Sequence, residues 1–271
     1  MQKKFFIGID SDGTAFDSMT IKHRKAFIPV MIEEWSLEPY AEKVREICES
    51  INLYSATRGI DRFSGLQLTF DRFRESGIPV PDYSALPGFL KSGKLSNATL
   101  EAYLREHDDP FLRTVLEWSR RADELFQREV EALPPFRGVL RALKKAYGRA
   151  DVAVISSASE SSLRSDWKKE DLLRYVTRIF GQEFGGKKAQ LAAAVTGVYE
   201  PRRTMMIGDA AGDWEAAKSV GAWFYPMIPG REEESWSEFC DLWLDRFLED
   251  SFGEGDQKLL MERFHAAIGG K

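Results

Sequence analysis

The spacing of short apolar runs limits the folds open to this chain more than any other feature. Phe5–Ile9 is a continuous apolar run that ends at an acidic turn, which is typical of a buried parallel strand. The next such run, Val152–Ile155, follows more than 140 residues later. Further runs at 178–180, 204–207 and 222–225 come at the intervals of strand–helix–strand units. The sequence therefore predicts an α/β fold whose parallel sheet has a detached first strand.

The long interval after the first run carries helical spacing and no convincing strand pattern. Helices are expected over 20–35, 39–53, 62–76, 97–107 and 111–132, with a loop over 77–93. In the later half, helices are expected over 159–175, 187–196, 213–220, 236–248 and 256–268. We therefore expect two domains: an α/β core formed by 1–16 and 135–271, with extra C-terminal helices over 231–271, and an all-helical domain over 17–134.

Charge and cysteine content exclude several classes of protein. The formal charge of −5 disfavours a general nucleic-acid binder, which would be basic. Only two cysteines, Cys48 and Cys240, are present, so a reducing, cytoplasmic setting is expected rather than a secreted disulfide scaffold. Three scattered histidines offer little to a zinc site. No apolar run approaches the roughly 18 residues of a membrane span, so no membrane partner is expected.

Acidic residues follow two of the expected strands. Asp10 and Asp12 come directly after the first strand, and Asp209 and Asp213 come after the run at 204–207. If these strands are neighbours, four carboxylates converge at the carboxyl edge of the sheet, where ligands bind in open α/β folds. Converging carboxylates repel one another unless a cation joins them, and oxygen-only ligation suits Mg²⁺. The alternative is that each aspartate only caps a helix or makes a turn.

Groups suited to phosphate lie near the same edge. Ser156 and Ser157 follow the strand at 152–155 and offer a hydroxyl and backbone N–H groups at a strand-to-helix turn. Lys187 or Lys188, at the start of the helix before the run at 204–207, could supply a positive charge. Taken singly, the serine is equally an ordinary helix cap and either lysine a solvated helix start. Their order along the chain favours a phosphate site.

These motifs resemble the haloacid dehalogenase superfamily, over most of residues 5–228. Asp10–Ser18 resembles its first motif, Val152–Ser156 the second, Lys187 the third, and Gly208-Asp209-x-x-x-Asp213 the fourth. The resemblance implies a Rossmann-like core and a helical cap inserted after the first motif. Ala15 stands where a larger aliphatic residue is usual, and Ser11 is unusual, but neither change removes a reacting group.

The resemblance also implies a role for each motif residue. Asp10 would attack phosphorus and form an aspartyl-phosphate, while Asp12 would protonate the leaving oxygen and then take a proton from water. Mg²⁺ would be held by Asp10, by Asp209, by the backbone carbonyl of Asp12, and by Asp213 directly or through water. Ser156 and Lys187 would bind the phosphoryl oxygens, with Ser157 beside them as a further binding residue. Lys187 is favoured over Lys188 because Leu191 follows four residues later, as in related sequences.

Asp12 separates the reaction classes of the superfamily. The dehalogenases it contains lack this second carboxylate, because a departing halide needs no proton, whereas an alkoxide leaving group does. We therefore expect a magnesium-dependent phosphatase that hydrolyses a small phosphorylated metabolite. A phosphomutase of the same fold and a non-catalytic phosphate-binding module remain open. The sequence does not identify the oligomeric state.

One loop of the expected helical domain is a candidate for selecting the substrate. Tyr54–Phe63 contains Gly59 between Arg58 and Arg62, so a flexible residue lies between two permanent cations. Caps in the superfamily use such loops to choose substrates, and we expect Arg58 and Arg62 to bind substrate. The alternative is a solvated connection in which Asp61 starts a helix.

Overall fold

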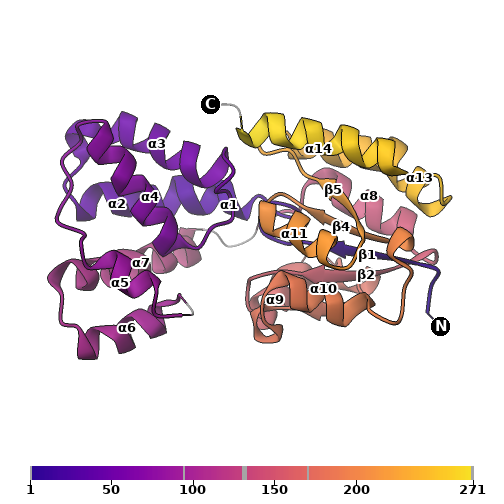
Figure 1. Ribbon diagram of the computed structural model, residues 1–271, viewed down its shortest axis with the longest axis horizontal. Helices are drawn as coiled ribbons and strands as arrows, with labels where there is room; N and C mark the ends of the chain where they lie inside the picture. The colour runs from indigo at the N-terminus through magenta and orange to yellow at the C-terminus, as the bar shows by residue number, and fades with distance from the viewer. Residues whose placement is uncertain (1, 94, 130–132, 170, 270–271) are drawn as a thin grey trace. The chain divides into compact units, whose positions relative to one another are not determined.

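A five-stranded parallel sheet forms the centre of the α/β unit. The computed structural model describes residues 2–93, 95–129, 133–169 and 171–269. The strands are β1 (Phe5–Ile9), β2 (Ala150–Ile155), β3 (Arg178–Phe180), β4 (Thr204–Gly208) and β5 (Trp223–Pro226). Their order in the sheet is β3-β2-β1-β4-β5, so the first strand is the central one (Figure 1). The expected α/β class and parallel sheet are confirmed.

Helices cover both faces of this sheet, which explains why its strands are apolar throughout. Successive side chains of β1 alternate between the faces: Phe5, Ile7 and Ile9 join one core and Phe6 joins the other. The helices on the first face are α8 (Arg137–Ala146), α9 (Glu160–Lys169), α12 (Glu232–Glu238) and α13 (Leu244–Leu248). Those on the second are α10 (Lys187–Val195), α11 (Ala211–Ser219) and α14 (Glu254–Gly269). The unit is therefore a doubly covered, Rossmann-like sandwich.

The chain divides into two compact units. One contains the described residues of Met1–Met19 and Ala132–Lys271, and the other is Thr20–Glu131. The two connections between them run side by side within the α/β unit, since Phe16 forms a bridge with Pro135 and Phe136 N–H donates to the Ala15 carbonyl. Thus the helical unit is inserted after β1 through two adjacent connecting segments.

The described residues of the second unit form helices and no strands. The elements are α1 (Ser18–Lys22), a π-helical turn (His23–Phe27), α2 (Ile28–Glu34), a 3₁₀ turn (Glu38–Tyr40), α3 (Ala41–Leu53), α4 (Arg62–Glu75), α5 (Leu86–Leu90), α6 (Asn97–Glu106) and α7 (Pro110–Glu129). They enclose a separate apolar core that includes Phe63, Phe70, Phe73, Phe89 and Trp118. The unit therefore packs around a core of its own.

Several sequence-based boundaries were wrong. The segment 77–93 is not all loop, because α5 lies within it. The helix expected over 236–248 begins earlier, at Glu232, and contains a π-helical turn at Phe239–Trp243. The helix expected over 159–175 is α9 followed by a separate 3₁₀ turn at Leu173–Tyr175, and residue 170 lies outside the described residues. The expected helix end at 130–132 also lies outside them.

Smaller elements complete the α/β unit. Two 3₁₀ turns, Gln182–Phe184 and Pro201–Arg203, precede α10 and β4 respectively. Helix α8 was not anticipated from the sequence. No helix among the described residues is long and apolar enough to cross a membrane.

Candidate active site

Three buried carboxylates meet at the carboxyl edge of the sheet. Asp10 directly follows β1, Asp209 follows β4, and Asp213 lies in the first turn of α11. Parallel pairing of Ile9 with Ile207 brings the ends of the two strands level, and Asp10 N–H donates to the Ile207 carbonyl at 3.0 Å. One oxygen from each of the three aspartates lies within 4.8 Å of the others. Three of the four carboxylates expected at this edge, those of Asp10, Asp209 and Asp213, therefore lie together.

Gly208 makes room for this arrangement. A Cβ atom at this position would lie 2.3 Å from Cγ of Asp213, a distance at which one of the two must move. Asp213 is fully buried, and its Oδ2 accepts a hydrogen bond from Ala210 N–H at 3.1 Å. The absence of a side chain at Gly208 thus lets the Asp213 carboxylate lie against the end of β4.

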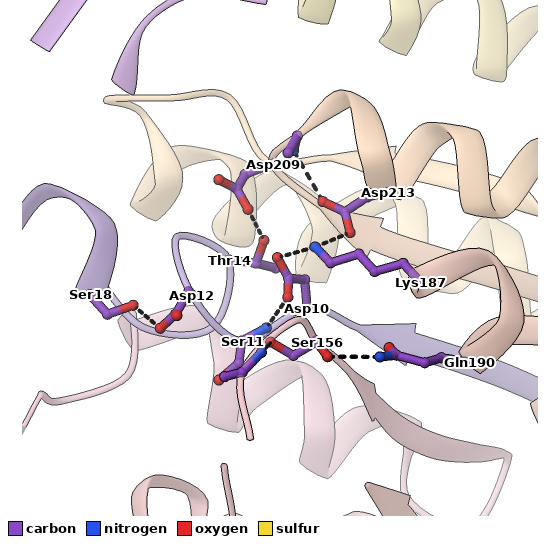
Figure 2. Close-up of polar contacts among 12 residues, drawn as sticks. Asp10, Ser11, Asp12, Thr14, Ser18, Ser156, Lys187, Gln190, Asp209 and Asp213 are labelled. Carbon is purple, nitrogen blue, oxygen red and sulfur yellow. Dashed lines mark hydrogen bonds and ion pairs between the residues drawn. The ribbon is translucent and has the colours of Figure 1, made fainter. Parts of the chain in front are cut away.

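Lys187 extends from the start of α10 between two of the carboxylates (Figure 2). Its Nζ lies 2.8 Å from Oδ2 of Asp10 and 2.6 Å from Oδ1 of Asp213. The neighbouring Lys188 faces solvent and pairs with the exposed Glu215 at 3.5 Å. Lys187 is therefore the lysine that enters the cluster.

Burial and charge act in opposition on the protonation of this cluster. Burial, assisted by the negative charges of Asp213 and Asp209, raises the pKa of Asp10, while Lys187 opposes the rise. Burial likewise raises the pKa of Asp213. Burial alone would lower the pKa of Lys187, but the surrounding carboxylates outweigh it and raise that pKa. Lys187 is therefore held as a cation. The pKa values of Asp10 and Asp213 remain raised despite its charge, so the lysine does not fully neutralise the cluster.

Asp12 points in a different direction. Its carboxylate accepts a hydrogen bond from the Ser18 hydroxyl, and Figure 2 shows it turned toward Ser18 rather than toward Asp10. Gly13 follows with a φ of 78°, a left-handed conformation that lets the chain turn back so that Gly13 N–H reaches the Phe16 carbonyl. The structure thus keeps the Asp12 carboxyl apart from the triad. The expected part of its backbone carbonyl in metal binding stays a prediction.

The two serines after β2 differ in their surroundings. Ser156 is 2% exposed, its N–H donates to the Phe180 carbonyl, and its hydroxyl accepts from Ala158 N–H at 3.3 Å. Ser157 is exposed. Because β2 pairs with β1 in parallel, with Val154 opposite Ile9, Ser156 and Asp10 leave the sheet at the same edge. The phosphoryl-binding roles of both serines stay predictions.

Sequence reasoning missed several residues that orient this site. Thr14 donates its hydroxyl to Oδ1 of Asp209 at 2.7 Å. Ser11 N–H donates to Oδ1 of Asp10 at 2.8 Å, and the Ser11 hydroxyl accepts from the indole N–H of the buried Trp167 at 3.0 Å. Thr14 and Ser11 lie inside the first motif, so their place in the sequence could have indicated a role at the site. Nothing in the sequence indicated that Trp167 contacts Ser11, because this contact depends on how α9 packs.

The two arginines chosen from the sequence lie in the helical unit and are engaged there. Arg58 is 4% exposed and donates to the Leu53 carbonyl at 2.9 Å. Arg62 donates to the Ser119 hydroxyl and to Asp123, both at 2.8 Å. Asp61 caps α4 by accepting from two backbone N–H groups, as the alternative interpretation supposed. The substrate-binding roles of both arginines stay predictions.

A small pocket in the same unit borders Arg62. His23, Asn52, Thr69 and Trp118 line it, among others. Burial, assisted by the positive charges of nearby arginine and lysine side chains, lowers the pKa of His23 to about 4. His23 is therefore neutral at physiological pH, so the cationic character of this region comes from the arginines and lysine.

The carboxylate cluster fits a hard divalent cation. All three side chains offer oxygen, all are buried, and the one nearby lysine leaves negative charge in excess. Asp10, Asp209 and Asp213 would hold the ion. A cation held there would lie at the edge of a parallel sheet where ligands bind in open α/β folds.

Comparison with known proteins identifies the class. The model of the haloacid dehalogenase-like hydrolases matches residues 7–221, so the chain belongs to this family of hydrolases. The suspected resemblance is confirmed. No curated protein sequence matches the chain.

Similar solved structures come from several bacteria. One is described as a predicted phosphoglycolate phosphatase from Haemophilus somnus, with 14% identity, a TM-score of 0.49, and coverage of 85% of this chain and 87% of the other. Another is a putative hydrolase of the family from Bacillus subtilis, at 15% identity, a TM-score of 0.47, and coverage of 84% and 89%. A third is the L-2-haloacid dehalogenase of Xanthobacter autotrophicus, at 15% identity, a TM-score of 0.41, and coverage of 84% and 78%.

Proposed function

We propose that this hydrolase is a magnesium-dependent phosphatase that acts on a small phosphorylated metabolite in the cytoplasm. The observation that carries the proposal is the pair of aspartates after β1, one inside the buried carboxylate cluster and the other outside it. A phosphate ester needs both a nucleophile and an acid for its leaving oxygen, and the two environments separate these roles. Displacement of a halide needs no such acid.

The steps balance with the residues present. An oxygen of Asp10 attacks phosphorus while the bond to the leaving oxygen breaks, and that oxygen takes a proton from Asp12. Asp12, now a carboxylate, removes a proton from water as the water attacks the aspartyl-phosphate. The bond between phosphorus and Asp10 then breaks, which releases inorganic phosphate and restores both side chains. Mg²⁺ held by Asp10, Asp209 and Asp213 would supply positive charge for the phosphoryl group.

The chain's own groups favour each stage. Lys187 holds positive charge beside Asp10, which supports a role in attracting the phosphoryl oxygens. Ser11 N–H fixes one Asp10 oxygen, which limits rotation of the nucleophile. The hydrogen bond from Ser18 gives Asp12 a defined resting position, from which it must turn to reach a leaving group. Ser156, which follows β2 at the same edge of the sheet, offers a hydroxyl for the phosphoryl oxygens.

Replacing the nucleophile tests the reaction directly. Asp10→Asn should abolish Mg²⁺-dependent hydrolysis of an aryl phosphate, because an amide cannot form the acyl-phosphate. Asp241→Asn is a matched control, since Asp241 lies on the surface in an exposed ion pair with Arg141. Chelation should stop the wild-type reaction and Mg²⁺ should restore it. Hydrolysis at the wild-type rate by Asp10→Asn, or in excess chelator, would refute the mechanism.

The same assay separates the two alternatives. A phosphomutase would move the phosphoryl group between hydroxyls of one substrate and release little inorganic phosphate. A binding module would bind inorganic phosphate without turnover of any phosphate ester. A panel of phosphorylated sugars, nucleotides and acids then identifies the substrate class.

We further propose that the helical unit serves as the substrate-selecting cap and that Arg58 and Arg62 contribute to that choice. Arg58→Ala and Arg62→Ala should each lower kcat/KM for the preferred substrate by about tenfold, or about 1.4 kcal/mol, and change aryl phosphate hydrolysis much less. Because both side chains also bond within their unit, melting temperatures should be measured in parallel. Equal losses on both substrates would contradict a selective role.

A further inference from the structure

Gln190 is a fully buried polar residue on an otherwise apolar helix face. It lies on α10 beside Leu191, Ala194 and Val195, all of which are buried in the core against the sheet. Its Nε2 lies 3.0 Å from the Ser156 carbonyl, 3.0 Å from the Gly181 carbonyl and 2.8 Å from the Gly185 carbonyl. Three acceptors around one atom identify that atom as the amide nitrogen rather than the oxygen.

The amide oxygen of Gln190 shows that burying this side chain is energetically unfavourable at one end. The Gln190 Oε1 is buried and has no hydrogen-bond partner among the described residues. An unpaired buried acceptor is unfavourable, and an apolar side chain of the same shape would avoid it. The compensation lies at the nitrogen, whose two N–H hydrogens are shared among three backbone carbonyls. Gln190 therefore acts on the backbone around it.

Two of the three carbonyls, those of Ser156 and Gly185, lie in the segments that carry the phosphoryl-binding groups of the proposed phosphatase, and the third, that of Gly181, follows β3. Ser156 supplies a carbonyl to Gln190, as Figure 2 shows, and also the hydroxyl that is expected to bind a phosphoryl oxygen. Gly185 lies two residues before Lys187, at the beginning of α10, which has no side-chain cap. One amide group thus anchors both the turn after β2 and the start of the helix that bears Lys187.

We propose that Gln190 is a positioning residue that sets the spacing between the Ser156 turn and Lys187, and so the affinity of the site for a phosphoryl group. The inference rests on the proposed phosphatase function. Without the Gln190 donor, the carbonyls of Ser156 and Gly185 repel each other and the two segments separate. Both phosphoryl-binding groups then shift relative to Asp10, while the three aspartates keep the hydrogen bonds that they accept from Ser11, Thr14 and Ala210.

Replacement of Gln190 by methionine tests this idea, because methionine keeps the volume and removes the donor. The KM for an aryl phosphate and the Ki for inorganic phosphate should each rise about tenfold, with a smaller fall in kcat. Gln257→Met is a matched control, since Gln257 also bonds backbone groups, those of Phe224 in β5, outside the site. The control should lose thermal stability and keep the wild-type Ki. A purely structural role for Gln190 would lower its melting temperature and active fraction without moving Ki.

A second variant covers the case in which Gln190→Met does not fold. Gln190→Asn keeps an amide but withdraws it by one methylene, so it should give a smaller rise in Ki. An unchanged Ki in either folded variant, with the wild type active, would overturn the positioning role and leave the phosphatase proposal standing. A wild type that binds inorganic phosphate without turnover would instead refute the phosphatase proposal, and the phosphate Kd of the variants would still test Gln190.

Discussion

Removing the buried lysine should destabilise the metal-free protein by a large and predictable amount. The Lys187 side chain is 14% exposed and contacts both Asp10 and Asp213, whose side chains are 6% and 0% exposed. Lys187→Met would leave these buried carboxylates without their cation. Breaking a buried ion pair in this way costs about 3–5 kcal/mol, because the remaining charge is desolvated and unpaired. We expect a loss of that size in the free energy of unfolding.

Urea denaturation in the presence of a chelator measures this loss. Lys188→Met is the matched control: the same substitution one residue later removes an exposed lysine whose partner Glu215 is also exposed, so stability should stay at the wild-type value. Addition of Mg²⁺ should narrow the gap between Lys187→Met and the wild type, because a bound cation neutralises the same carboxylates. Equal stability of the two methionine variants under chelation would refute the description of Lys187 as the counter-ion of this cluster.

Three further substitutions test other parts of the structure. The pKa of His23 is about 4 in the folded protein and 6.5 in the unfolded chain, so only the unfolded chain takes up a proton as the pH falls between these values. Acidification from about pH 7 to pH 5 should therefore lower the free energy of unfolding by about 2 kcal/mol. His23→Gln should remove this pH dependence in urea denaturation. Trp167→Phe removes the buried donor to Ser11 and should lower the free energy of unfolding by about 1–3 kcal/mol; an unchanged value would contradict the contact. Gly208→Ala places a methyl group against Asp213 and should raise the Mg²⁺ concentration needed for half-maximal activity by about tenfold or more; a normal Mg²⁺ titration would show that the carboxylate tolerates displacement.

The carboxylate cluster was predictable because its position follows from topology alone. Parallel strands end at one edge, so an aspartate directly after β1 and another directly after β4 must meet once the two strands pair. Asp213 lies in the first turn of α11, the helix that begins directly after β4 and Asp209, so it stays at the same edge. For these residues, motif and sheet together leave little freedom.

Side-chain direction was less accessible to sequence reasoning. The position of Asp12 in the motif was clear, but its turn toward Ser18 depends on a rotamer and on one hydrogen bond. Gln190 appeared as one polar residue in a helix, and its role emerged only from three carbonyls that the fold brings to it. Helix α8 is a different case, because it could have been predicted from the sequence. Its buried residues have the spacing of an amphipathic helix: Val139, Ala142, Leu143 and Ala146.

The central position of β1 has a consequence for how the chain is made. This strand is synthesised first, yet its neighbours in the sheet begin at Ala150 and Thr204. During synthesis the apolar run Phe5–Ile9 therefore stays unpaired along both edges until the whole helical unit has been produced. The helical unit has a local core and can form in that interval, but the sheet must close loops of more than 100 residues before β1 is paired. Nascent chains halted once the helical unit has left the ribosome should accordingly expose the unpaired apolar segment Phe5–Ile9, and they should need a chaperone more than the finished protein does.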